Sequence, residues 1–139
     1  MNFKRIGERF VIRIDKDEKI VETTKKICIE NEIHLGVISG IGAVSKAKIG
    51  MFKPEEKEYV STELIGDYEI TSLNGNITTM NGEAYLHVHI NLADEEHKTF
   101  GGHLDEAIVS VTCEVIIEKI EGSIDREFDE KTGLNLLKI

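Results

Sequence analysis

The sequence of 139 residues contains one proline, two cysteines and no tryptophan, and aromatic residues make up only 6% of it. Its 40% hydrophobic and 31% charged residues are typical of a folded protein, which excludes an extended disordered or collagen-like chain. Cys28 and Cys113 lie far apart and form no CxxC pair, which excludes a zinc ribbon and a thioredoxin-like redox motif. We expect both cysteines to be buried, reduced thiols.

Basic residues and long hydrophobic runs are also scarce. Seventeen Lys and Arg against 26 Asp and Glu give a net charge of −9, which would repel a nucleic acid from most of the surface. Stretches without a charged residue, such as residues 33–45, are too short to cross a bilayer. The first residues carry charges before any apolar segment forms, unlike a secretory signal. These observations predict a cytoplasmic protein that does not enter a membrane.

Hydrophobic spacing predicts one long helix and a series of strands. Apolar residues at helical spacing indicate a helix within residues 17–32, and residues 4–14 have the pattern of one strand. After Ile33, turn signals separate short runs rich in Val, Ile, Thr and Tyr. These turn signals are Gly40-Ile41-Gly42, Lys53-Pro54-Glu55-Glu56, Asn74-Gly75, Asn81-Gly82 and Gly101-Gly102. We therefore expect a single α+β domain over residues 1–139, an antiparallel β-sheet meander packed with one main α-helix.

One predicted strand carries two histidines on its polar face. In residues 84–92, Ala-Tyr-Leu-His-Val-His-Ile-Asn-Leu, aliphatic residues alternate with polar ones. His87 and His89 therefore project from the same face, close enough to hold one ion. A return strand after the turn at residues 94–96 would bring His103 beside them. The candidate metal ligands are thus these three histidines.

Three neutral imidazoles suit a divalent metal ion. Zinc, iron, nickel and copper all accept such ligands, and a three-ligand site leaves a coordination position for water or substrate. A solvated or oligomer-facing polar row that holds no ion would show the same HxH spacing. We expect His97 to be exposed in a turn and His34 to be a structural residue between the helix and a strand, so neither joins the set.

A strand expected over residues 107–120 offers a further polar group, Glu114. If this strand lies beside the histidine strand, Glu114 is a candidate base for a metal-bound water, because a bound ion lowers the pKa of its water. A partly exposed glutamate without a catalytic role is the alternative interpretation. Nothing in the sequence matches a nucleophile elbow or a phosphate-binding loop. The sequence leaves open whether the protein is an enzyme.

Four segments form a set whose order and spacing are specific. They are residues 37–44 (Val-Ile-Ser-Gly-Ile-Gly-Ala-Val), 66–77 (Gly-Asp-Tyr-Glu-Ile-Thr-Ser-Leu-Asn-Gly-Asn-Ile), 86–89 (Leu-His-Val-His), and 101–104 (Gly-Gly-His-Leu) leading to 112–115 (Thr-Cys-Glu-Val). Together they resemble the PPC domain family, the plants and prokaryotes conserved domain that also forms the body of plant AT-hook nuclear proteins. The resemblance implies an antiparallel sheet packed with a helix, assembly into a homotrimer, and a metal site at His87, His89 and His103 as in bacterial and archaeal members.

The resemblance also bears on partners. Family members are often labelled DNA-binding, but in the plant proteins an AT-hook with an Arg-Gly-Arg-Pro core contacts the minor groove, and this chain lacks that core. The leading hypothesis is a cytoplasmic homotrimer that binds a divalent metal ion, zinc above others, with an open position for a small anionic or carbonyl ligand. The alternatives are a DNA-associated or protein-interaction regulatory scaffold and a metal-dependent hydrolase or lyase.

Overall fold

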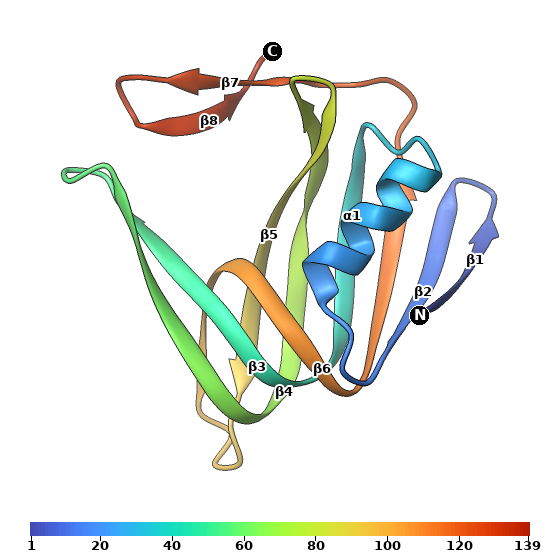
Figure 1. The fold of residues 1–139 in the computed structure, drawn as a ribbon, viewed down its shortest axis with the longest axis vertical. Coiled ribbons are helices and arrows are strands. Elements are labelled where there is room, and N and C mark those ends of the chain that lie inside the picture. The colour runs from blue at the N-terminus through green and yellow to red at the C-terminus, as the bar shows by residue number, and fades with distance from the viewer.

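The computed structural model describes all 139 residues and shows long, bent strands with one helix packed against them (Figure 1). The strands are β1 (Asn2–Ile6), β2 (Arg9–Asp15), β3 (Gly36–Lys53), β4 (Glu58–Met80), β5 (Glu83–Ala93), β6 (Thr99–Lys119), β7 (Arg126–Asp129) and β8 (Leu134–Leu137), and the helix is α1 (Ile20–Glu30). β3, β4 and β6 contain 18, 23 and 21 residues, whereas a typical strand has about 5–6 residues. Such length lets one strand pair with different neighbours along its course.

The main sheet has the strand order β1-β2-β6-β3-β4-β5, and every pairing in it is antiparallel. β6 pairs with β5 as well, so that β3, β4, β5 and β6 form a closed circuit of neighbours. β7 and β8 form a separate two-stranded ribbon. The predicted antiparallel sheet with one main helix is therefore confirmed. The prediction of a meander of short strands is wrong, because β2 and β3 both flank β6 and because three of the expected turns lie inside long strands. These expected turns are Gly40-Ile41-Gly42 in β3, Asn74-Gly75 in β4 and Gly101-Gly102 in β6. The closure through β6 is an addition that local sequence patterns did not indicate.

The N-terminal segment is a hairpin, so the prediction of one strand over residues 4–14 is wrong. β1 and β2 pair from Ile6 and Arg9 outward, and the turn between them contains Gly7, whose φ is 60°. The apolar pattern had suggested continuity because Ile6 precedes the turn. Ile6 is exposed, whereas Phe10 on β2 is completely buried. The apolar residues on both sides of the tight turn thus produced a sequence pattern that is the same as that of a single strand.

α1 is shorter than the expected helix and has one buried face. It covers Ile20–Glu30, and the flanking residues Asp17 and Glu32 have positive φ angles of 68° and 51°, which a helix does not tolerate. The buried face of α1 contains Ile20, Thr24, Ile27 and Cys28 and packs mainly against β6 and β5. The helix falls short of the length and hydrophobicity needed to span a membrane.

The core lies between α1 and the sheet and includes both cysteines. Cys28 and Cys113 are buried and form no disulfide, as predicted. Burial raises the pKa of both thiols to about 12, because the thiolate loses its hydration. The two thiols are therefore packing groups of the core.

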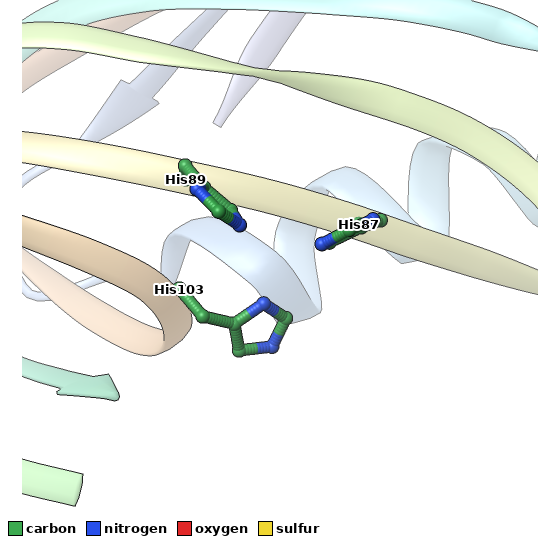
Figure 2. Close-up of side chains that lie close together, drawn as sticks. All are labelled: His87, His89 and His103. Carbon is green, nitrogen blue, oxygen red and sulfur yellow. The ribbon is translucent and has the colours of Figure 1, made fainter. Parts of the chain in front are cut away.

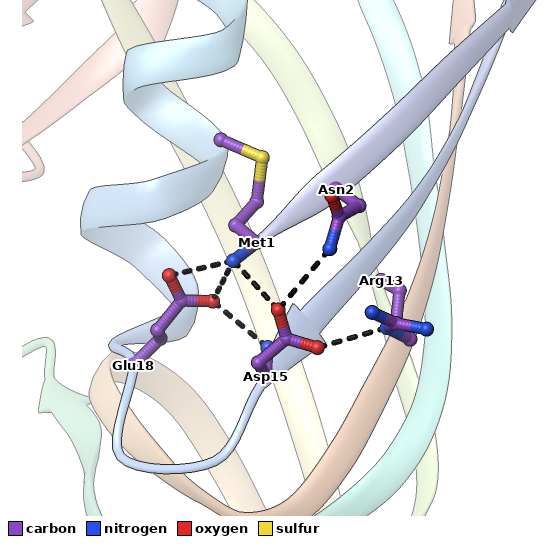
Figure 3. Close-up of polar contacts among 5 residues, drawn as sticks. All are labelled: Met1, Asn2, Arg13, Asp15 and Glu18. Atoms are coloured by element: carbon purple, nitrogen blue, oxygen red, sulfur yellow. Dashed lines mark hydrogen bonds and ion pairs between the residues drawn. The ribbon is translucent and has the colours of Figure 1, made fainter.

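The N-terminal amino group fastens β1 to the segment that leads into α1 (Figure 3). The nitrogen of Met1 donates to Asp15 Oδ2 and to Glu18 Oε1, each at 2.8 Å. Asp15 also accepts a hydrogen bond of 2.8 Å from Arg13 Nε. These contacts raise the pKa of the amino group and lower the pKa values of Asp15 and Glu18, chiefly through the hydrogen bonds between them.

Candidate metal centre

The structure brings His87, His89 and His103 together on two neighbouring strands. His87 and His89 project from one face of β5, and His103 is the direct partner of His89 in the β5–β6 pairing. One ligand nitrogen from each residue lies within 4.8 Å of the other two. The ring centroids are 5.2 to 5.8 Å apart. Figure 2 shows the three rings turned toward a common point.

Two glycines allow the strands around the histidines to approach closely. Gly75 on β4 pairs with Val88, and a Cβ there would lie only 2.1 Å from the carbonyl oxygen of His87. A Cβ on Gly101 would lie 2.2 Å from the carbonyl oxygen of Ile90. Neither position therefore accepts a side chain without movement of the backbone. The Gly101-Gly102-His103 sequence thus places the third histidine against β5.

The surroundings favour neutral histidines. The pKa of His87 is lowered, first by burial and then by the positive charge of Arg126. The pKa of His103 is lowered by burial, which outweighs the opposing effect of Asp105. A neutral imidazole keeps a free lone pair, which a metal ion requires. Both groups are therefore prepared for coordination at neutral pH.

One ring nitrogen of His103 has no partner within the protein. Nδ1 is buried and forms no hydrogen bond, which costs about 1–3 kcal/mol for a polar atom removed from water. The other nitrogen, Nε2, lies 3.9 Å from Asp105 Oδ1, a group that sequence reasoning did not identify. Three convergent imidazoles, one with an unsatisfied nitrogen, fit a metal ion that accepts nitrogen ligands. A carboxylate beside such a ligand helps to orient the ring.

The three histidines line a pocket of about 430 Å³ that includes residues from β3 to β8. Its apolar wall contains Met51, Phe52, Tyr59, Leu134 and Leu136. The polar part contains Tyr85, Asn135 and Arg126 in addition to the histidines, and no Asp or Glu lines the pocket. The pocket therefore has room for a small molecule beside the three histidines.

The sequence matches a known family over most of its length. The profile of the Plants and Prokaryotes Conserved (PCC) domain matches residues 1–121. The chain belongs to the PCC domain family. The resemblance to the PPC domain, the same family under another abbreviation, is thereby confirmed.

Solved structures of similar proteins cover the whole PCC chain. A candidate DNA-binding protein from Bacteroides thetaiotaomicron is 32% identical, with 99% of this chain and 96% of that chain covered and a TM-score of 0.96. A metal-containing protein from Archaeoglobus fulgidus is 37% identical, with 100% and 99% covered and a TM-score of 0.90. A PPC protein from Pyrococcus horikoshii is 34% identical, with 99% and 94% covered and a TM-score of 0.87.

A curated relative is much longer than this PCC chain. The bifunctional protein GlmU from Synechococcus sp. (strain JA-3-3Ab) is 24% identical over an alignment of 127 residues, and the match covers 89% of this chain. The chain spans only 19% of the length of that protein. The match therefore carries no activity over to the PCC chain.

Glu114 does not lie with the histidines of the PCC chain. Only the first five residues of the β6 pairing, Thr99 to His103, lie against β5, whereas Glu114 pairs with Arg13 of β2. Glu114 is exposed and lines a different cavity of about 760 Å³. The arrangement in which it would act as a base near the ion is therefore absent.

The remaining histidines lie outside the cluster. His97 is exposed in the turn before β6, with a φ of 63°, as expected. His34 is exposed in the connection between α1 and β3, where the neighbouring Ile33 is the buried residue, so the prediction of a structural role for His34 is wrong. Neither residue contributes to the pocket.

Arg126 is a charged pocket residue that sequence reasoning missed. It belongs to an acidic segment near the C-terminus, and nothing in that segment indicated burial. In the structure Arg126 is 7% exposed and lines the pocket of the three histidines. Its position depends on the docking of the β7–β8 ribbon, which is a tertiary contact.

Proposed function

We propose that this PCC domain binds a divalent metal ion, zinc above others, through His87, His89 and His103. The observation that carries the proposal is the unpartnered Nδ1 of His103 within a cluster of three convergent imidazoles. The similar protein from Archaeoglobus fulgidus is a metal-containing protein, which supports it. A zinc ion on three histidines supplies a Lewis-acid centre with one position open to a small anionic or carbonyl ligand.

Metal content tests the proposal directly. Untagged wild-type protein is compared by elemental mass spectrometry with the double variant His87→Ala, His89→Ala. The matched control is His34→Ala, His97→Ala, which removes two exposed histidines outside the cluster. We expect near-stoichiometric metal in the wild type and the control and none in the first variant. Absence of metal from the wild type after incubation with zinc contradicts the proposal.

The same proposal includes a homotrimer, and an uncovered apolar surface supports it. Val11 on β2, Ile116 on β6 and Ile41 on β3 are 43%, 45% and 58% exposed. Val11 and Ile116 are direct partners in the β2–β6 pairing, so their side chains form a continuous strip. Contiguous exposed apolar surface favours self-association. The single helix does not cover this face.

Light scattering after size-exclusion chromatography tests the trimer. We expect light scattering to give wild-type protein a molar mass of three times the chain mass and Ile41→Glu a smaller molar mass. Ile29→Glu is the control, because Ile29 is 60% exposed on α1, away from the strip. A monomeric wild type contradicts this part of the proposal.

A regulatory scaffold that associates with DNA is the second candidate. The similar protein from Bacteroides thetaiotaomicron is a candidate DNA-binding protein, which favours it. The net charge of −9 opposes it, because the protein would be repelled by phosphates. Anisotropy of a labelled DNA duplex at physiological salt separates the two candidates. We expect no binding, and retention of the duplex by metal-free protein favours the scaffold.

A metal-dependent hydrolase or lyase is the enzymatic form of the same proposal. It requires an activity that chelation abolishes and zinc restores. Glu114 has no part in it, since this residue lies in another cavity. The proposal further places residues 1–139 in one domain and the protein in the cytoplasm, a reducing compartment in which two free thiols persist.

A further inference from the structure

We propose that Arg126 makes the histidine pocket a binding site for a small organic carboxylate. The inference rests on the proposed metal site for its second point of attachment, but the guanidinium is a separate and observable contribution. A small organic carboxylate is then the ligand for the open coordination position.

Arg126 is a buried cation without a counter-ion from the protein. Its side chain donates to three neutral acceptors: Nε to Thr78 Oγ1 at 2.8 Å, Nη1 to the carbonyl oxygen of Asn135 at 2.8 Å, and Nη2 to Asn76 Oδ1 at 2.9 Å. The guanidinium also lies over the ring of Tyr85, 4.8 Å from its centroid. An arginine stays charged at every physiological pH, and a buried charge is costly unless an opposite charge accompanies it.

The acidic residues beside Arg126 in sequence are engaged elsewhere. Asp125 accepts a hydrogen bond of 3.0 Å from Thr79 Oγ1, and Glu127 lies 3.5 Å from Lys138 Nζ. The fold thus provides a buried guanidinium, holds it with neutral groups and pairs the carboxylates next to it in sequence with other residues. An external anion is the counter-ion that completes this arrangement.

The pairing of β4 with β5 places Arg126 on the histidine side of the sheet. Asn76 is the direct partner of His87, and Thr78 is the direct partner of Tyr85. Arg126 is hydrogen-bonded to both β4 residues of these pairs. It therefore lies beside the metal ligands, and it lines the same pocket. A ligand in the pocket can contact the guanidinium and the open coordination position together.

The charge and lining of the pocket select the ligand. A guanidinium has five N–H donors, and the protein uses three, so two remain for a ligand. Three neutral imidazoles would leave the charge of a divalent ion intact, and no Asp or Glu lines the pocket, although Asp105 lies 3.9 Å from the Nε2 of His103. Apolar side chains, including Met51, Phe52 and Leu134, form the opposite wall. A carboxylate with a small apolar body matches these features better than inorganic phosphate does.

Arginine side-chain NMR tests the inference on the intact protein. Only four arginines occur, so the Nε–H signal of Arg126 can be assigned in a ¹⁵N spectrum by comparison with Arg126→Gln. Zinc-loaded protein is titrated with butanoate, with the neutral isostere butanamide, and with inorganic phosphate. We expect a saturable shift of the Arg126 signal with butanoate, a weaker response to phosphate and none to butanamide. The signals of Arg5, Arg9 and Arg13 should not move.

Affinity measurements on variants identify the group responsible. Calorimetry with butanoate should show binding at least about ten-fold weaker in Arg126→Gln, since a charge-assisted hydrogen bond is lost. Arg126→Lys should retain part of the affinity. Zinc content, measured by elemental analysis, should stay the same in both variants. If these variants do not fold, the comparison of butanoate with butanamide on wild-type protein decides the question.

The failure of this inference can be told apart from the failure of the metal site. Wild-type protein that takes up no zinc contradicts the proposed metal site. In that case the butanoate titration is repeated on the metal-free protein, and the Nε–H signal of Arg126 reports binding. A saturable shift there supports the carboxylate site. Equal binding of butanoate and butanamide, or unchanged butanoate affinity in a folded Arg126→Gln protein, overturns the inference.

Discussion

His89 and His103 are direct partners across the β5–β6 pairing, with ring centroids 5.8 Å apart and ring planes nearly perpendicular at 88°. The two residues come from different strands, and the turn between β5 and β6 is exposed. An ion held by both rings would therefore tie the strands together at the point where β6 leaves β5 for β3. Metal binding at this position should act on the stability of the whole sheet.

Zinc should raise the Tm of the wild-type protein and leave that of His103→Ala unchanged. A ligand that binds only the folded state at 100 times its Kd stabilises that state by about 2.7 kcal/mol. Thermal unfolding with and without zinc measures the effect. His97→Ala, an exposed histidine in the turn before β6, should respond like the wild type. An equal zinc response of His103→Ala would falsify the assignment of His103 as a ligand.

Zinc affinity should fall with acidification only below about pH 6.5. Protons and zinc compete for the same nitrogens, and burial lowers the pKa values of His87 and His103 from the ordinary histidine value of about 6.5. Lowered pKa values mean that protons are held less tightly, so competition from these two residues begins at a lower pH. Competition titrations against a chelator between pH 8 and pH 5 measure the profile. A steady loss of affinity between pH 8 and pH 7 would contradict this reading.

Gly75→Ala should destabilise the protein and reduce its metal content. The new Cβ would meet the carbonyl oxygen of His87 at 2.1 Å, so β4 and β5 must separate. Overpacking of this kind costs about 1–3 kcal/mol. Chemical unfolding and elemental analysis measure the two effects. Ser39→Ala on β3 is the control, because Ser39 is exposed and forms no side-chain hydrogen bond that would be lost.

Asp15 and Glu18 should make the protein sensitive to acid. Hydrogen bonds from the amino group of Met1 lower the pKa values of both carboxyl groups from 3.8 and 4.5 (Figure 3). Their contribution to stability is complete above these unfolded values and is lost as the pH falls through the lowered ones. In Asp15→Asn, Glu18→Gln, the free energy of unfolding should be reduced at pH 7 and depend less on pH below 4.5.

The control for the acid experiment removes the same charges elsewhere. Asp67→Asn, Glu30→Gln replaces two exposed carboxylates that have no contact with the amino group of Met1. Urea unfolding from pH 7 to pH 2.5 compares the three proteins. A pH profile of the Asp15 and Glu18 variant that equals the wild-type profile would show that the amino-group contacts contribute nothing.

Local patterns in the sequence were sufficient to place the helix and to put His87 and His89 on one face of a strand. Helical spacing placed α1, although its ends depended on backbone angles at Asp17 and Glu32. Alternation along residues 84–92 determined that His87 and His89 share a face, because successive side chains of a strand point in opposite directions. The same alternation led to an error before the helix, where a tight turn at Gly7 hides within an apolar pattern.

The sequence by itself determined the strand that carries the histidine pair, the burial of both cysteines and the family. The sequence also predicted that a return strand brings His103 to the pair, and the β5–β6 pairing bears this out. The tertiary structure alone decided which part of β6 lies beside β5, and it thereby placed Glu114 in another cavity. It alone also buried Arg126 beside the histidines. The physical reason is the distance in sequence between the residues involved. The face of a strand to which a side chain points follows from the two-residue repeat of that strand. Strand pairing and the docking of the β7–β8 ribbon depend instead on contacts between residues far apart in the chain.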